Sequence, residues 1–444
     1  MKYMTTLSIS NQKIKSFSFD PTGNFLFCVT EHELYVLDSH VFRVYGVIHP
    51  HSQIPISCMN FSPLWYAFVI IIHSKIFLYS AFTGDLLYEI DSPGGDFCIN
   101  ANFSYNGKYF VAIYNDGYYV LYSVSKIQNE DDNHFNIVLN KICEEKYDRA
   151  ITSFSYSSGS ELIALGFDNG KAIVRSTDPQ KSYQWIIQAH KQECVVYVYF
   201  NPNNAFEFMT RGMKKGDIKF FSIYQYGMKP PKNDNKSKNF KHQNIKNEIE
   251  CYRYFYLKNK CKIVTSSFSS DATILFAASS RMLFAFRTSD ASIINSLEFE
   301  RYVEIDSFYE IIPHLVIQYV AIVIAKSSLW IWNCLSNDFR CVVIQDVNDP
   351  LFQCGLLYAS NKAMIQTNAG TINFYSCETL QWQQQNHVID EYHGPWSDEI
   401  SKLLGEYKLP EIYKTMTIFE QRGLEFYSEG QVGLDIDSES SDFE

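Results

Sequence analysis

Short apolar segments separated by polar turns run along most of the chain and recur as a unit of four segments. Clear copies of the unit begin at Ile14, Ile56, Phe97, Ile151, Val195 and Ile263, and weaker copies begin at Val303 and Leu351. Neighbouring copies lie about 40 residues apart where no longer loop intervenes, a spacing typical of repeats built from four β-strands. The pattern therefore predicts a series of four-stranded sheets.

Two local signals favour strands over helices within each unit. Side chains alternate with a period of two, as from Ile14 to Phe19, and helical periodicity is absent there. Pairs such as Asp116-Gly117 and Asn169-Gly170 indicate hairpin turns, because these residues tolerate positive φ at both central positions of a tight turn. Each unit is therefore expected to fold as consecutive antiparallel hairpins.

A ring of such sheets is an all-β propeller, which leaves only short, protected sheet edges. One propeller domain at residues 1–390 can therefore hold nearly all of the 444 residues, in place of the about three domains that length alone suggests. We expect eight blades, with a seven-bladed ring as the alternative because the last two units are irregular. The expected blades are 14–48, 54–91, 96–126, 150–188, 194–224, 262–299, 303–345 and 350–385.

Two polar insertions interrupt the expected period, and an extension follows the repeats. Residues 127–148 are predicted to form an exposed acidic loop, and residues 225–262 a longer loop rich in lysine. The extension, 391–444, is predicted to contain a short helix at 397–409. From Glu425 onward it has seven acidic residues and no Lys or Arg, a composition typical of disordered tails.

The insertion at 225–262 carries the residues best suited to contact an acidic partner. A solvated, disordered loop is one interpretation, because its low hydrophobicity cannot bury enough apolar surface to order it. The other is a basic arm that contacts phosphates or an acidic protein surface, since clustered like charges often serve as interaction segments. The candidate contact residues are Lys229, Lys232, Lys236, Lys238, Lys241 and Lys246.

Net charge and cysteine content restrict the classes of function. A net charge of −11 argues against nucleic-acid or membrane binding by the whole surface, because that binding depends on Lys and Arg neutralising phosphates. The 11 cysteines include no CxxC pair, which argues against a disulfide framework and a zinc site. The N-terminus has no secretory signal, and the apolar runs are shorter than the roughly 18 residues of a membrane span. We expect an intracellular protein without membrane contact.

No pattern of catalytic residues is present in the sequence. The chain has no GxxxxGK[ST] phosphate loop, no GxSxG nucleophile turn and no HExxH metal motif. Because the repeat accounts for most apolar and turn positions, little of the sequence is left for an enzyme site. We expect no catalysis, cofactor, metal or small-molecule substrate.

The third segment of most units ends in a bulky residue followed by a small polar one, as in Tyr79-Ser80 and Trp332-Asn333. His190 precedes the unit that follows it, within Gln188-Ala189-His190. These features resemble the WD-repeat family, whose units open on Gly-His and close their third strand with Trp-Asp. The resemblance implies a propeller in which the family's Asp-His hydrogen bonds are mostly lost. Aromatic residues replace the family's tryptophan at Tyr79, Tyr122, Phe221 and Tyr375.

The order of the central features is similar to the propeller of bromodomain-and-WD-repeat proteins. The likeness covers residues 14–385 and includes a long polar insertion that ends in a short segment at 247–250. It implies a nuclear, chromatin-associated protein with histones or transcription factors as partners. The sequence has no bromodomain, and Trp332 is not followed by the arginine of the WDxR pattern that recruits a ubiquitin ligase.

Several functions are compatible with this sequence. The favoured one is a non-catalytic scaffold that mediates protein–protein contacts in a nuclear complex related to chromatin or transcription. One alternative is a nucleic-acid-binding or RNA-processing subunit that uses the basic segment 229–262. Further alternatives are a ubiquitin-ligase substrate receptor, a trafficking or cytoskeletal scaffold, or an enzyme on a propeller scaffold, since the fold alone does not select a function.

Overall fold

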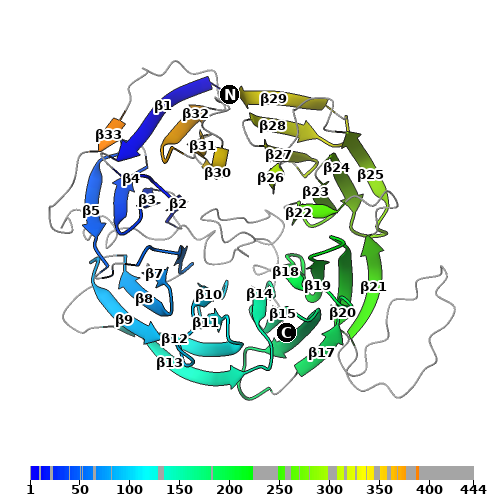
Figure 1. Ribbon diagram of the computed structural model, residues 1–444, viewed down its shortest axis with the longest axis horizontal. Coiled ribbons are helices and arrows are strands. Elements are labelled where there is room, and N and C mark those ends of the chain that lie inside the picture. The colour runs from blue at the N-terminus through cyan, green and yellow to red at the C-terminus, as the bar shows by residue number, and fades with distance from the viewer. Residues whose placement is uncertain are drawn as a thin grey trace, which may run out of the picture.

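Every strand that the structure describes belongs to one of eight sheets arranged in a ring (Figure 1). The computed structural model describes residues 2–389, and the gaps within that range are 10–11, 21–23, 40, 51, 53, 64–66, 82, 129–134, 182–183, 224–248, 256–261, 270, 280, 299–307, 315–317, 326–327, 337, 345–350, 358–361, 368 and 377–386. The helix predicted at 397–409 and the acidic segment after it lie outside the described residues.

Blades 1 to 4 each consist of four consecutive antiparallel strands. Blade 1 contains β2 (Ser16–Phe19), β3 (Phe25–Val29), β4 (Leu34–Asp38) and β5 (Val44–Ile48). Blade 2 contains β6 (Cys58–Phe61), β7 (Ala67–Ile72), β8 (Lys75–Ser80) and β9 (Leu86–Asp91). Blade 3 contains β10 (Cys98–Phe103), β11 (Tyr109–Tyr114), β12 (Tyr118–Gln128) and β13 (Phe135–Lys146). Blade 4 contains β14 (Ile151–Tyr156), β15 (Leu162–Phe167), β16 (Lys171–Ser176) and β17 (Gln184–Gln188).

Blades 5 to 7 repeat this order, and blade 8 has five strands. Blade 5 contains β18 (Val195–Asn201), β19 (Asn204–Gly212), β20 (Ile218–Ile223) and β21 (Ile249–Phe255). Blade 6 contains β22 (Ile263–Phe268), β23 (Ile274–Ser279), β24 (Met282–Arg287) and β25 (Ile293–Glu298). Blade 7 contains β26 (Phe308–Pro313), β27 (Val320–Ala325), β28 (Ser328–Asn333) and β29 (Asp338–Ile344). Blade 8 contains β30 (Leu351–Leu357), β31 (Lys362–Thr367), β32 (Ile372–Ser376), β1 (Lys2–Ile9) and β33 (His387–Ile389). The prediction of eight blades is confirmed, and the seven-bladed alternative is wrong.

The N-terminal strand closes the ring. β1 pairs antiparallel with β32, with Leu7 opposite Ile372, and β33 adds to its outer side in parallel. Thr6 donates a hydrogen bond to Asn373, which lies 367 positions away in the chain. The repeat pattern begins at Ile14 and did not assign this strand, because a single strand without its hairpin partners carries no repeat signal.

The second strand of several blades is buried along its whole length. All six residues of β7 and all six of β27 are buried, because these strands lie between two sheet neighbours and the adjacent blades (Figure 1). Such strands are continuously apolar rather than alternating. This burial explains the apolar runs near residues 67–72 and 320–325, which the sequence analysis found too short to span a membrane. None of the described residues forms a helix long and apolar enough to cross a bilayer.

The prediction of a loop at 127–148 is wrong for the described part of that segment, which is mostly strand. β12 extends into it, and β13 supplies the fourth strand of blade 3, with pairs from Tyr118 opposite Lys146 to Gln128 opposite Phe135. The segment is polar because an outermost strand has one face in water. Its Ile137 is nevertheless buried and packs in the core between blades 2 and 3.

Two further predictions need smaller corrections. The fourth strand of blade 5, β21 (Ile249–Phe255), lies inside the insertion predicted at 225–262. The turns at Asn115–Gly117 and Asp168–Gly170 form hairpins, but only the glycines have positive φ, at +88° for Gly117 and +81° for Gly170. This geometry matches a turn closed by a left-handed glycine rather than a turn with two left-handed residues.

Aromatic rings fill the positions where the resemblance implied replaced tryptophans. Tyr79 stacks on Phe68 of its own blade, with ring centroids 5.5 Å apart. Phe221 stacks on Phe208 at 5.2 Å. Tyr122 is half-buried, and the side chain of Tyr375 lies outside the described part of the chain. Aromatic pairs of this kind contribute about 0.5–1.5 kcal/mol beyond the area they bury.

Candidate functional site

The strand order gives the propeller two distinct faces. The top face is defined as the face that carries two kinds of loop: those that join the second strand of a blade to its third, and those that join one blade to the next. The bottom face carries the loops joining first to second and third to fourth strands. Strands β2, β6, β10, β14, β18, β22, β26 and β30 are the first strands of their blades and lie nearest the ring centre (Figure 1).

The six lysines predicted as contact residues, Lys229, Lys232, Lys236, Lys238, Lys241 and Lys246, lie outside the described residues. The two ends of that gap, Ile223 and Ile249, are opposite each other in the pairing of β20 with β21. The segment is therefore attached to the bottom face of blade 5. Contact with a partner by these lysines stays a prediction.

A group of basic side chains that the sequence analysis did not single out lies on the top face of the same blade. We call it the basic corner, and define it by Lys191, Arg211, Lys214, Lys215 and Lys262 together with the exposed apolar residues Met213 and Val264. Three loops bring these residues together. Lys214 Nζ donates to the carbonyl of Gln192 at 3.4 Å, and Arg211 donates to the carbonyl of Val264 at 2.6 Å.

The basic corner carries an excess of positive charge. In the described part of the chain, Lys191, Lys214, Lys215 and Lys262 are exposed and none of them forms an ion pair. Asp168, on the neighbouring loop, is an exposed carboxylate close to this surface, and its charge contributes to the raised pKa of Cys194. Exposed like charges repel unless a counter-charge is bound, so this surface favours an acidic ligand.

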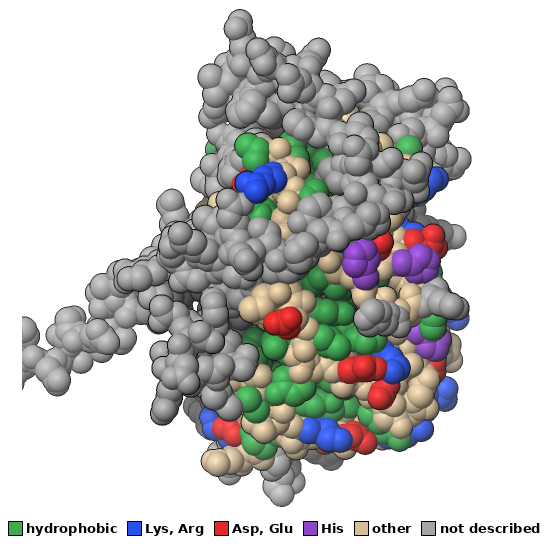
Figure 2. Space-filling model, turned by 90° about the vertical axis from the view of Figure 1, so that its left-hand side faces the viewer, with side chains coloured by type: hydrophobic (Ala, Val, Ile, Leu, Met, Phe, Trp, Pro, Cys, Tyr) green, Lys and Arg blue, Asp and Glu red, His purple; other side chains and the backbone are tan. Residues whose placement is uncertain are grey.

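The edge of the ring at blades 1 and 2 shows the contrasting arrangement. Figure 2 shows basic, acidic and histidine side chains close to one another along one margin of that edge. Lys15 pairs with Glu31 at 3.2 Å, and His49 pairs with Glu33 at 3.0 Å. Lys15 there has an acidic partner within the protein, whereas the four exposed lysines of the basic corner have none among the described residues.

A buried carboxylate holds the loop that presents two of the corner lysines. Glu193 is 4% exposed, and its Oε2 accepts hydrogen bonds from the backbone N–H groups of Lys214 at 2.7 Å and Lys215 at 3.1 Å. Met213 N–H donates to the carbonyl of Cys194. The backbone at residues 213–215 is thereby fixed, so the lysine side chains start from defined positions.

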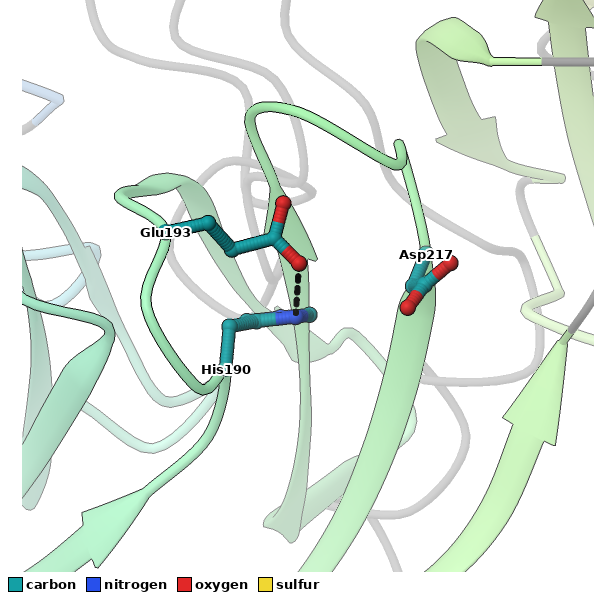
Figure 3. Close-up of side chains that lie close together, drawn as sticks. All are labelled: His190, Glu193 and Asp217. Atoms are coloured by element: carbon teal, nitrogen blue, oxygen red, sulfur yellow. Dashed lines mark ion pairs between the residues drawn. The ribbon is translucent and has the colours of Figure 1, made fainter.

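Glu193 belongs to a cluster with His190 and Asp217, which Figure 3 shows lying together beneath this loop. His190 Nε2 lies 2.9 Å from the hydroxyl of Thr210, and its Nδ1 lies 3.9 Å from Glu193 Oε1. That second gap is too long for a hydrogen bond, and Nδ1 makes none. The histidine that the sequence identified as the Gly-His remnant therefore keeps a hydrogen bond to the next blade's second strand.

Burial controls the protonation of His190. Desolvation of the buried ring, together with the charge of Lys219, lowers the pKa of His190 to about 4, although Glu193 and Asp217 act in the opposite direction. The ring is therefore neutral at physiological pH. A neutral ring suits a cluster whose role is to support a loop.

We expect the free energy of unfolding to decrease as the pH is lowered, because of this histidine. The pKa of His190 is about 4 in the folded state, against the ordinary value of about 6.5 expected in the unfolded chain, so the unfolded chain binds a proton first as pH decreases. The contribution is fully present above pH 6.5 and falls by about 2 kcal/mol on reaching pH 5. Urea unfolding of the wild type and of His190→Gln at pH 7 and pH 5 measures it. An equal pH dependence in the two proteins contradicts this expectation.

The three residues of the cluster can each offer a ligand atom to a metal, and these atoms lie within 4.8 Å of one another. The existing contacts favour loop support instead. His190 Nε2 and Glu193 Oε2 are already hydrogen-bonded, and a Cβ at Gly212 would lie 2.8 Å from both His190 Nδ1 and Glu193 Cδ. The backbone at Gly212 thus fills the space beside the cluster.

Below the basic corner, aromatic rings continue along the boundary between blades 5 and 6. Arg211 lies over the ring of Tyr197 at 5.6 Å. Tyr197 stacks on Tyr199 at 5.7 Å, and Tyr199 on Phe268 at 5.9 Å. Tyr197 and Tyr199 are half-buried, so this row offers flat apolar surface next to the positive charge.

The bottom face has a depression of about 770 Å³ over the turns of blades 3 to 5. Its lining includes charges of both signs: Lys108, Glu161, Asp178 and Lys181. Lys181 lies 3.9 Å from Asp178, so part of this charge is neutralised internally. The depression lacks the one-signed charge of the basic corner and is the weaker candidate site.

His190 could be singled out from the sequence, whereas Glu193 could not. A single Glu three residues after a His matches no sequence motif. Its role depends on the contact of two loops at the boundary between two blades. The repeat frame was the available signal, because it places His190 before the first strand and Asp217 before the third strand of one blade.

Comparisons with known proteins establish the fold. No family model and no curated protein matches the sequence. Sqt1 of Saccharomyces cerevisiae is 10% identical, with a TM-score of 0.60 over 84% of this chain and 99% of that one. The C-terminal WD40 domain of Sif2 is 11% identical, with a TM-score of 0.60 over 85% of this chain and 98% of that one. The Cps50 (Swd1) propeller of Myceliophteria thermophila is 12% identical, with a TM-score of 0.47 over 82% and 97%.

The likeness to Sqt1 and to the Sif2 domain, together with the ring of four-stranded blades, shows that this chain has the β-propeller fold of WD40 domains. At these identities the likeness concerns the fold alone. The finer resemblance to bromodomain-and-WD-repeat proteins stays a prediction.

Proposed function

We propose that this chain is a non-catalytic scaffold that binds protein segments at the basic corner on its top face. The observation that carries the proposal is a set of exposed lysines that form no ion pair with the described residues. They lie next to Met213, which is 53% exposed, on a loop held by Glu193. Fixed loops lose little conformational entropy on binding, which favours affinity. The WD40-type fold of the chain is compatible with this role but does not select it.

Affinity purification from the native cell tests this proposal. The corner variant Lys214→Glu/Lys215→Glu is compared with Lys108→Glu/Lys181→Glu, which reverses two exposed lysines on the bottom face. We expect specific co-purifying proteins to be reduced at least fivefold by the corner variant and unchanged by the bottom-face variant. Equal recovery with both variants and the wild type would exclude the basic corner as the binding site.

The proposal extends to a nuclear complex related to chromatin or transcription. Its support is the layout shared with bromodomain-and-WD-repeat propellers, which implies histones or transcription factors as partners. The positive charge of the corner favours acidic segments within such partners. Fluorescence microscopy of the tagged full chain, combined with identification of the co-purifying proteins, tests this extension. A cytoplasmic signal with coat or cytoskeletal subunits would select a trafficking scaffold instead.

Nucleic-acid binding is the second candidate function. It is favoured by the presence of the basic corner and the lysine-rich segment 225–262 on one blade. Phosphate contacts make affinity fall steeply with salt. A binding constant for single-stranded RNA that decreases by orders of magnitude between 50 and 200 mM salt would support this function, and salt-independent or absent binding would remove it.

A further inference from the structure

We propose that the acidic segment 435–444 of this chain binds the basic corner and competes there with partner segments. The inference rests on the proposed function, since it names an occupant of the same surface. Intramolecular occupancy would make the scaffold self-limiting, because a partner must displace the segment before it binds.

Charge complementarity is the first argument. The segment DIDSESSDFE has five acidic residues and no basic one. The basic corner presents Lys191, Arg211, Lys214, Lys215 and Lys262, with Asp168 as the exposed acid beside it. Individual exposed ion pairs are weak, at about 0.2–1 kcal/mol, so several must form together for useful affinity. A run of carboxylates on one short segment provides them.

Apolar contacts are the second argument. Met213 is 53% and Val264 is 38% exposed, and both lie among the corner's basic side chains. The segment contains Ile436 and Phe443 between its acids. Apolar side chains spaced between carboxylates match a surface that carries both apolar and basic residues.

The fixed backbone of the corner is the third argument. Glu193 holds the N–H groups of Lys214 and Lys215, and Gly212 N–H donates to the carbonyl of Asp217 at 3.0 Å. A ligand therefore meets a loop that is already ordered, and the entropy of ordering is limited to the segment itself.

The segment can reach the corner from the end of the propeller. The last described strand, β33, ends at Ile389, so residues 390–434 form the connection. This connection of about 45 residues spans up to about 150 Å when extended, whereas a folded domain of about 390 residues has a radius of gyration of only about 21 Å. Tethering also gives the segment an effective concentration in the millimolar range, so a weak contact suffices.

A peptide-binding experiment on full-length chains tests the inference. The probe is a fluorescein-labelled synthetic peptide of residues 435–444. The receptors are the wild type and a neutralised chain in which the five acids of the segment are changed: Asp435→Asn, Asp437→Asn, Glu439→Gln, Asp442→Asn and Glu444→Gln. Because the neutralised chain no longer occupies its own corner, we expect it to bind the peptide at least fivefold more tightly than the wild type does.

Two further variants, each combined with the neutralised chain, locate the contact. Lys214→Glu/Lys215→Glu is expected to weaken peptide binding at least tenfold, and the matched bottom-face control Lys108→Glu/Lys181→Glu to change it less than twofold. Raising the salt concentration should weaken binding, since the contact is between exposed charges.

Several outcomes would overturn the inference. The first two are the absence of peptide binding and equal binding by the wild-type and neutralised chains. A third is a difference between these chains that depends on protein concentration, because the segment would then bind another copy of the chain. A fourth is displacement of the labelled peptide by a single-stranded DNA 12-mer at a lower concentration than unlabelled peptide requires. If partner capture still depends on the corner while the peptide does not bind, the proposed function stands and this inference alone fails.

Discussion

Replacing Gly170 with alanine is expected to destabilise the propeller by at least about 4 kcal/mol, a loss large enough to unfold many domains. Gly170 has a φ of +81°, and a Cβ there would lie 1.8 Å from the carbonyl oxygen of His190 and 2.6 Å from that of Glu193. Both contacts are with backbone, so no side-chain rotation relieves them. The loop that supports the basic corner must move, and we therefore expect ligand binding at the corner to be lost as well.

Gly95→Ala is the matched control for this substitution. Gly95 has a similar φ of +80°, but a Cβ there would meet nothing within 4 Å. Its replacement should cost only the strain of a left-handed alanine, about 1 kcal/mol. Urea unfolding of both variants measures the difference. If Gly170→Ala loses no more stability than Gly95→Ala, the backbone contact between blades 4 and 5 is not what constrains this glycine.

Deletion of residues 1–9 is expected to have the second large effect, a loss of at least about 4 kcal/mol in the free energy of unfolding. β1 contributes the buried side chains Leu7 and Ile9 and the backbone pairing that joins β32 to β33. Removal of one buried leucine side chain alone costs about 2–5 kcal/mol. The deletion also leaves β32 as the outermost strand of blade 8, with its outer edge unpaired.

A synthetic peptide of residues 1–9 should restore the stability of the truncated chain when added in trans. For a truncated chain that fails to fold, Leu7→Ala serves as the second variant and should cost about 2–4 kcal/mol. Ser8→Ala, at a half-buried position of the same strand, is the control and should change stability by less than about 0.5 kcal/mol. Thermal unfolding of the truncated chain at the wild-type temperature would contradict a closing role for β1.

The fold was predictable because its information is local and repeated. Alternating and apolar segments, with turns at positions such as Asn169-Gly170, gave the strands and the blade count. Two strands were not predicted, because each depends on contacts with residues far away in the sequence. β1 is recognisable only once β32 is in place, and β13 was hidden because the polar run at 128–134 precedes it and its apolar residues, such as Ile137, pack on another blade.

The candidate site was less predictable than the fold. Sequence reasoning selected lysines by their density along the chain, and that density lies at 225–262. The basic corner instead gathers single residues from three loops, from Lys191 to Lys262, which are far apart in sequence. Glu193 illustrates the same limit, since nothing local distinguishes it until the loop at Lys214 is placed against it.

Ring closure by β1 also sets the order of events during synthesis on the ribosome. The strand is translated first, but its partner β32 is translated only near the end of the propeller, and 367 positions separate Thr6 from Asn373. At roughly 5–20 residues per second, the interval between them is about 20–75 s. Throughout that interval β1 has no neighbour, and blades already formed stand in an open arc with unpaired edges. Chaperone contact with nascent chains is therefore expected to concentrate on this strand, and to end once β32 has emerged from the ribosome and paired with it.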